Sequence, residues 1–176
     1  MTAAIRQVLD DAQVLFSQHP ELARTASVVR AELRDATLVQ IQAGGYAFMA
    51  DEPRAAGGGG AAPSPVQYAL AALASCATIT YRYWSELLGI PIDSVKVEVR
   101  GEADLRGFLG FDPDVAPGAS SVQIHVAVGG SAPEEDYRRL HHAVETHCPV
   151  LAMFSTVTAV TTTMATRAGS DPTPSR

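Results

Sequence analysis

The sequence contains very little lysine and no excess of positive charge. Lys96 is the single lysine of the 176 residues, and 13 Lys and Arg residues stand against 19 Asp and Glu residues, which gives a net charge of −6. Surfaces that bind nucleic acid need clustered basic residues to neutralise phosphates. The charge balance therefore excludes nucleic acid from the expected partners.

The sequence also lacks a long hydrophobic run. No apolar stretch reaches the roughly 18–20 residues that are needed to cross a bilayer. The N-terminal segment carries Asp10 and Asp11 where a secretion signal would need its apolar core. We therefore expect a cytoplasmic protein without a membrane partner.

Cysteine is equally scarce, because the chain has only Cys76 and Cys148. In a reducing cytosol a disulfide is more often transient and catalytic than structural. His141, His142 and His147 lie near Cys148 in the sequence, but their spacing fits no metal-ligand template. The run of glycines at 57–60 lacks the flanking residues of a phosphate-binding loop. We expect neither a metal nor a cofactor.

The hydrophobic pattern divides the chain into helices and strands. Helical spacing over 3–17 and 133–147, and strand-like alternation with turn signals within 25–50, indicate regular elements. The predicted order is a helix at 3–17, strands at 25–33, 37–43 and 46–50, a helix at 65–88, strands at 94–105 and 121–128, a helix at 133–147 and a strand at 155–165. This order predicts an α+β fold, with helices packed on antiparallel sheet.

The segment before the long helix, residues 51–65, is rich in glycine and proline. Its composition predicts a flexible loop that leads the chain into the helix. Ser64 is suited to the N-cap, Pro65 to the first turn, and Gly89 to the end of the helix. The loop at 106–119 is expected to be irregular.

Cys76 lies in the middle of this helix. The residues that share its side at helical spacing are small or apolar: Ala69, Ala72, Leu73, Ile79, Thr80 and Tyr83. Cysteine is among the most buried residue types. The helix pattern by itself therefore leaves two readings open, a core cysteine and a reactive thiol.

Three stretches resemble one protein family. They are "DEPRAAGGGGAAPSPVQYALAALASCATITY" at 51–81, "DLRGFLGFDP" at 104–113 and "CPV" at 148–150. The first resembles the OsmC/Ohr family, and its OsmC-like branch in particular. The resemblance covers roughly residues 28–165. We accordingly expect an N-terminal helical extension at 1–24, an OsmC-like domain at 25–168 and a disordered tail at 169–176.

The resemblance implies an intertwined homodimer with long central helices that carry the reactive cysteine. It also implies a thiol peroxidase that reduces organic hydroperoxides. Cys76 would attack the peroxide as a thiolate and become a sulfenic acid, and Cys148 would resolve it as a disulfide. A dithiol, lipoyl-type in several members, or a small thiol would then reduce that disulfide.

The activating groups depart from the family pattern. Members use an arginine to stabilise the thiolate and a glutamate at the start of the long helix to hold that arginine. Here Gln67 stands in place of the glutamate, and an amide forms a weaker clamp than a carboxylate. Gln67 also lies about 180° round an ideal helix from Cys76. Arg34 is the first candidate for the arginine, and Arg54 and Arg106 are its rivals.

Two alternatives follow from this departure. One is a dimer with weak or no peroxidase activity that binds a small apolar ligand at its interface. The other is a dithiol that exchanges sulfur or disulfides with other carriers and has no preference for peroxides. Phe108, Leu109 and Phe111 in the 106–119 loop fit either a lid over a partner's pocket or packing across the dimer.

Overall fold

The computed structural model describes residues 2–166; the predicted disordered tail at 169–176 lies outside this range. The helices are α1 (Thr2–Gln18), α2 (Pro65–Leu88), α3 (Leu105–Phe108), α4 (Glu134–His147) and α5 (Pro149–Ser155), with short 3-10 turns η1 (Pro20–Ala23) and η2 (Arg54–Ala56). The strands are β1 (Val29–Asp35), β2 (Leu38–Ala43), β3 (Tyr46–Ala50), β4 (Ser94–Ala103) and β5 (Ala119–Gly129). The predicted α+β class is confirmed.

Helix α2 begins and ends where the sequence signals place it. The Ser64 side chain accepts a hydrogen bond from the Gln67 backbone N–H, and the Gln67 side chain accepts one from the Ser64 N–H, so the pair forms a capping box. Gly89 ends the helix with a left-handed φ of 66°, a conformation that glycine adopts without steric cost. Both ends are therefore fixed by local chemistry.

The strands form two separate antiparallel sheets. The first has the order β1-β2-β3, with Ala31 opposite Ile41 and Gln40 opposite Met49. The second is the long hairpin of β4 and β5, in which Val97 lies opposite Val126. Alternate residues of β4 are half-buried and exposed along most of its length, as expected for a sheet with one covered face.

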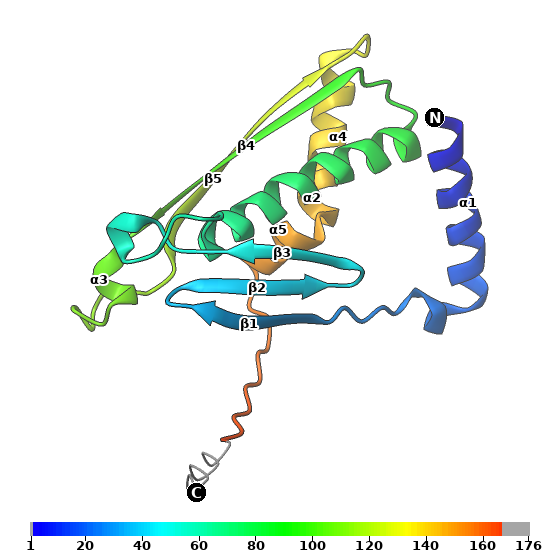
Figure 1. Cartoon of the computed structure of the whole chain (residues 1–176). Coiled ribbons are helices and arrows are strands. Elements are labelled where there is room, and N and C mark those ends of the chain that lie inside the picture. Colours follow the sequence, from blue (N-terminus) through cyan, green and yellow to red (C-terminus); the bar gives the residue numbers. More distant parts are fainter. Residues whose placement is uncertain (1, 167–176) are drawn as a thin grey trace, which may run out of the picture.

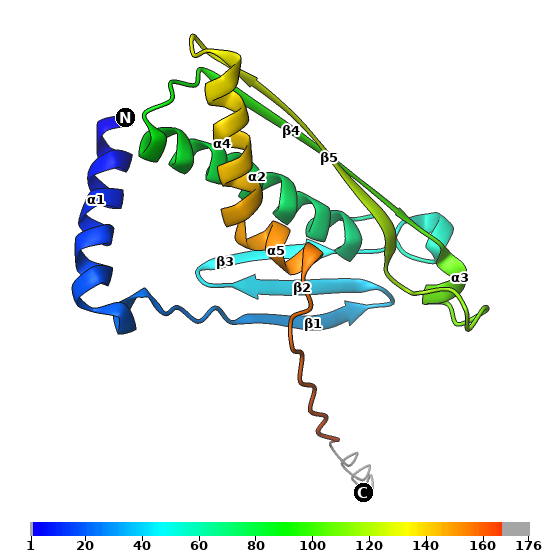
Figure 2. The same ribbon diagram turned by 180° about the vertical axis from the view of Figure 1, so that it is seen from behind.

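Helix α2 lies at the centre of the molecule and contacts β4, α4 and α5 (Figures 1 and 2). The buried core lies where α2 meets α4. Its members are Ala77, Tyr81, Ile90, Leu140, Val144 and Cys148, each at most 4 % exposed. Leu140 and Val144 belong to the apolar face predicted for the helix at 133–147.

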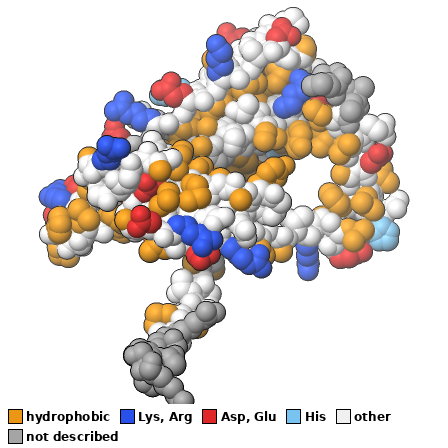
Figure 3. Space-filling view, in the orientation of Figure 1, with side chains coloured by type: hydrophobic (Ala, Val, Ile, Leu, Met, Phe, Trp, Pro, Cys, Tyr) orange, Lys and Arg blue, Asp and Glu red, His pale blue; other side chains and the backbone are white. Residues whose placement is uncertain are grey.

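Many large apolar side chains lie outside this core. Among the described residues, 23 large hydrophobic side chains are exposed against 8 buried apolar residues. Figure 3 shows such side chains gathered over the central part of one face. Exposed apolar area on this scale is typical of a surface that another molecule covers.

The prediction of a C-terminal strand at 155–165 was wrong. Pro149 starts a short helix, α5, that the sequence pattern did not reveal, and residues 157–166 have no regular structure. This segment leaves the body of the molecule (Figure 1), and Val157 is fully exposed. A strand needs a neighbour to accept and donate its backbone hydrogen bonds, and within the described chain this segment has none. The β-branched residues of this segment indicate a preference for extended structure, which is not sufficient to form a strand without a neighbour.

The loop at 51–65 is more ordered than its composition suggested. It folds around the buried carboxylate of Asp51, which accepts hydrogen bonds from the Thr37 hydroxyl (2.6 Å) and from the backbone N–H groups of Glu52 (2.9 Å) and Ala61 (3.0 Å). Gly58 is required at its position, because a Cβ atom there would lie 2.0 Å from the Glu52 carbonyl oxygen. The predicted irregular loop at 106–119 likewise contains a short helix, α3.

Asp51 makes the stability of the fold sensitive to acid. The Ala61 N–H and the Thr37 hydroxyl hold the pKa of Asp51 below its ordinary value of 3.8. A depressed pKa stabilises the folded state above the unfolded-state pKa, and that stabilisation is lost as the pH falls through the folded-state pKa. Asp51→Asn should therefore lower the melting temperature by several degrees at pH 7 and by less near pH 3, where the loss of the charge has begun.

Thermal unfolding at the two pH values measures this difference. The exposed Asp93, replaced by asparagine, is the matched control and should change neither melting temperature appreciably. An Asp51→Asn protein that loses the same stability at pH 3 as at pH 7 would contradict the role given to the carboxylate charge.

None of the helices in the described range combines the length and the hydropathy needed to cross a membrane.

Candidate active site

The two cysteines meet between α2 and the junction of α4 and α5. Cys76 lies on α2 and is partly buried, whereas Cys148 is 1 % exposed. The backbone N–H of Cys148 bonds to Val144 O (2.9 Å), and its carbonyl accepts from the Ala152 N–H (3.0 Å). The residue that ends α4 therefore also caps α5, which fixes its position. Cys76 packs against the core cluster that contains Cys148, and both thiols are free.

The surroundings of Cys76 favour the protonated thiol. Burial raises the pKa of Cys76 above its ordinary value, and the neighbouring Cys148 raises it further. The Val150 backbone N–H, in the first turn of α5, and the Thr80 hydroxyl lower the pKa but do not outweigh burial. A thiolate at neutral pH would need additional positive charge beside the sulfur.

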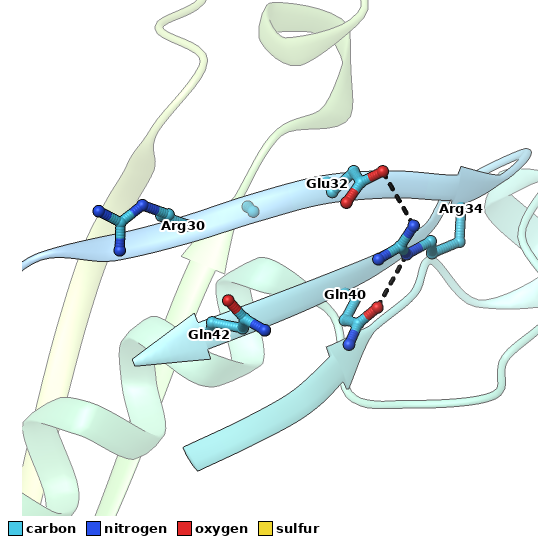
Figure 4. Close-up of a pocket in the computed structure, with 6 residues that line it drawn as sticks. Arg30, Glu32, Arg34, Gln40 and Gln42 are labelled. Atoms are coloured by element: carbon cyan, nitrogen blue, oxygen red, sulfur yellow. Dashed lines mark hydrogen bonds and ion pairs between the residues drawn. The ribbon is translucent and has the colours of Figure 1, made fainter. Parts of the chain in front are cut away.

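None of these contributions comes from an arginine or lysine side chain within the described part of the chain. Arg34, the first candidate from the sequence, lies on β1 (Figure 4). Its guanidinium donates to Glu32 Oε1 (2.9 Å) from Nη1 and to Gln40 Oε1 (2.8 Å) from Nε. The guanidinium is thus held in a fixed orientation by two acceptors.

Arg34 is on the side of the sheet that faces away from α2. Val29 and Ile41 line a pocket together with Ser75 of α2, so their face of the sheet is turned toward that helix. Arg34 and Glu32 share the opposite face with Arg30, Gln40 and Gln42 (Figure 4), because alternate residues of a strand point to opposite sides. Arg34 therefore does not approach the Cys76 of its own chain.

Glu32 is a candidate site residue that the sequence reasoning missed. Its carboxylate forms an ion pair with Arg34, which is the role assigned in the family pattern to a glutamate at the helix start. The available signal was the spacing, since residues two apart on a strand share a face.

Gln67 lies in the first turn of α2 and caps the start of that helix. Its side-chain oxygen accepts the Ser64 N–H (2.8 Å) in the capping box of α2. The amide oxygen that was considered as a partner for a guanidinium is therefore engaged in starting the helix.

The rival arginines are held locally. Arg54 donates to Gly59 O (3.4 Å) inside the glycine-rich loop. Arg106 is paired with Asp104 (2.6 Å) and Asp112 (3.2 Å) at the tip of the β4–β5 hairpin. Neither is among the groups that shift the pKa of Cys76.

The histidines near Cys148 do not form a metal site. His147 packs on the Trp84 ring with a centroid distance of 4.2 Å, and His141 bonds to the buried Tyr81 hydroxyl. In the described range there is no group of three or more His, Cys, Asp or Glu side chains that could hold a metal ion.

A pocket of about 300 Å³ with a mixed apolar and serine lining lies one helical turn from each cysteine. Leu73 lines it one turn before Cys76 on α2, and Leu151 lines it one turn after Cys148 on α5. The other lining residues are Ala119, Ser120, Ser121, Val122, Ile124, Phe154 and Ser155. Apolar side chains thus form part of a pocket close to the two cysteines, although neither cysteine lines it.

Comparisons with known proteins agree on one family. The model of the family described as "OsmC-like protein" matches residues 57–163. No curated protein matches the chain significantly.

Solved structures share the fold at low sequence identity. An OsmC-like protein from Mycoplasma pneumoniae superposes with a TM-score of 0.66 at 16 % identity, covering 76 % of this chain and 89 % of that one. An organic hydroperoxide resistance protein OsmC from Legionella pneumophila gives a TM-score of 0.57 at 18 % identity over 72 % and 87 % of the two chains. One from Elizabethkingia anophelis, with crystallant-derived thiocyanate bound, gives 0.53 at 16 % identity over 72 % and 85 %.

Proposed function

The chain belongs to the OsmC-like protein family, and on that basis we propose that it is a cysteine-based peroxidase that reduces organic hydroperoxides. The observation that carries the proposal is the packing of Cys76 against the core cluster that contains Cys148, with both thiols free and a pocket one helical turn away. A peroxide-reducing thiol needs a second thiol within reach before further oxidation destroys it.

The proposed cycle uses the two cysteines in turn. The Cys76 thiolate attacks the outer peroxide oxygen, the O–O bond breaks, and the alcohol leaves after taking a proton. Cys76 is then a sulfenic acid. The Cys148 thiol attacks its sulfur, water leaves, and a Cys76–Cys148 disulfide forms. A dithiol, lipoyl-type or a small thiol compound, reduces the disulfide to two thiols and is itself oxidised to a disulfide.

The pocket favours an organic peroxide over hydrogen peroxide. Val122, Leu151 and Phe154 contribute apolar surface to its lining, and burial of a hydrocarbon group against them is favourable by about 25 cal/mol per Å². Two solved neighbours are named organic hydroperoxide resistance proteins, which points to the same substrate class. Because the cycle needs a reducing environment, we assign the protein to the cytoplasm.

The proposal includes a homodimer. The exposed apolar side chains of the chain (Figure 3) need a cover, and a two-fold dimer is the commonest way in which a protein covers such a surface. The position of Arg34 favours the same conclusion, because its guanidinium faces away from its own Cys76. In the proposed dimer Arg34, held by Glu32, is directed toward Cys76 of the second copy.

Arg34→Gln should slow the reaction of Cys76 with peroxide about tenfold or more at pH 7. The positive charge lowers the thiol pKa, so its removal raises that pKa and shifts the rate profile to higher pH. Stopped-flow rates measured across the pH range give this shift. Arg30→Gln removes the same charge from the same sheet face and is the control; if both variants react alike, Arg34 is not the activating residue.

A specific observation also supports a second candidate function. In the single chain the pKa of Cys76 is raised by burial, and no cation of residues 2–166 is among the groups that lower it. A thiol left in this state would suit a dimer that binds a small apolar ligand, or a dithiol that exchanges disulfides without preference for peroxides.

Consumption of cumene hydroperoxide by the wild-type protein, with dihydrolipoamide as reductant, tests the proposed function. We expect turnover with this substrate and slower turnover with hydrogen peroxide. Absence of peroxide loss, together with disulfide exchange at an ordinary rate, would favour the second candidate.

A further inference from the structure

Helix α1 is attached to the rest of its own chain over only part of its length. The Arg6 guanidinium donates to two carbonyls at the C-terminal end of α2, Glu86 O (2.8 Å) and Leu87 O (3.4 Å). The side chains of Ile5, Val8 and Leu9 line a pocket of about 320 Å³ with Tyr83 of α2. Arg6 thus satisfies carbonyls that a helix end leaves without partners, and it places α1 across that end.

The second half of α1 continues beyond this contact. The whole of α1, with 17 residues, spans about 25 Å. The residues named above that contact α2 all belong to its first half. Leu15 and Phe16 follow on the same helical face as Ile5 and Val8, yet they are 43 % and 41 % exposed. Figures 1 and 3 show α1 separated by an opening from the β1–β3 sheet.

Helix α2 carries an exposed apolar stripe that includes Tyr83. Ile79, Tyr83 and Leu87 are spaced four residues apart, so they form one stripe along the helix, and they are 54 %, 46 % and 36 % exposed. Tyr83 belongs both to this stripe and to the α1 pocket. A molecule that covers the stripe therefore lies against α1 as well.

We infer that α1 is an arm that packs against a second copy of this chain, with Leu15 and Phe16 covering apolar surface of that copy. The inference rests on the homodimer of the proposed function and adds a contact to it. A second copy fits because the stripe is apolar and can pair with itself about a two-fold axis. The copy seated on Tyr83 then fills the opening beside α1.

Site-directed photocrosslinking in the full-length protein tests the arm directly. Phe16 is replaced by p-benzoylphenylalanine in one protein and Val14 in another. Val14 is similarly exposed, at 58 %, but it lies on the opposite face of α1. Irradiation should give a covalent dimer from position 16 and little or none from position 14.

A second measurement uses dimer affinity. Leu15→Asp combined with Phe16→Asp should raise the dimer dissociation constant about tenfold or more, and Val14→Asp should leave it unchanged; circular dichroism shows whether α1 is still helical. A wild-type dimer that gives no interchain crosslink from position 16 overturns the arm, while peroxide turnover is unaffected by that result. A wild-type protein that sediments as a monomer overturns the homodimer and the arm together.

Discussion

Cys76→Ser is expected to lower the second-order rate constant for cumene hydroperoxide by roughly 10³-fold or more. A serine hydroxyl is not deprotonated at neutral pH, and its oxygen is a poor nucleophile toward a peroxide. The neighbouring Cys148 cannot replace it, because Cys148 is 1 % exposed and peroxide does not reach its sulfur. Stopped-flow measurement under excess peroxide gives the rate constant.

Ser75→Ala is the matched control for this variant. Ser75 precedes Cys76 on α2, and its hydroxyl bonds only to the Ala72 carbonyl of the same helix (3.1 Å). Alanine favours the helix and leaves the thiol pair intact, so the rate should stay within about twofold. If the wild type and Cys76→Ser react with cumene hydroperoxide at the same slow rate, Cys76 is not the residue that attacks the peroxide.

Leu140→Ala should lower the free energy of unfolding by about 2–5 kcal/mol. Leu140 is fully buried in the core between α2 and α4, where it packs with Tyr81, Val144 and Cys148. Its truncation leaves a cavity at the contact that holds α4 beside α2. Because α4 carries Cys148 to Cys76, we also expect slower disulfide formation in the folded variant.

Leu109→Ala provides the comparison for Leu140→Ala. Leu109 is 52 % exposed in the hairpin loop, and its truncation should change the free energy of unfolding by less than about 0.5 kcal/mol. Denaturant unfolding at one fixed protomer concentration is required, because dimerisation contributes to apparent stability. Equal effects of the two substitutions would contradict the position given to the core.

The parts of the fold that local chemistry determines could be predicted from the sequence. Ser64, Pro65 and Gly89 define both ends of α2 through capping interactions within a few residues. The hairpin of β2 and β3 likewise follows from the turn at Gly44-Gly45. Such signals need no knowledge of the tertiary structure.

Features that depend on distant contacts could not be predicted in this way. The β-branched run after Ser155 carries a strand pattern, but a strand forms only with a neighbour, and the described chain offers none. The loop at 51–65 appeared flexible because its order comes from Asp51, whose partner Thr37 lies 14 residues earlier in the sequence.

The candidate site shows the same division. Cys76 and Cys148 were paired from the family resemblance, and this pairing stays a prediction; in the structure Cys76 packs against the core cluster that contains Cys148. Gln67 caps the start of α2, where its side chain accepts the Ser64 N–H. The ion pair of Glu32 with Arg34 was missed although the spacing of two residues along a strand places both side chains on one face.

The proposed cycle requires that peroxide link Cys76 to Cys148 within one chain. Intact-mass measurement after one equivalent of cumene hydroperoxide tests it most directly. We expect a loss of about 2 Da per chain, the mass of two hydrogen atoms, and a gain of about 16 Da, one oxygen, in Cys148→Ser. Wild-type chains that keep two unmodified thiols, or that gain oxygen without forming the link, would contradict it.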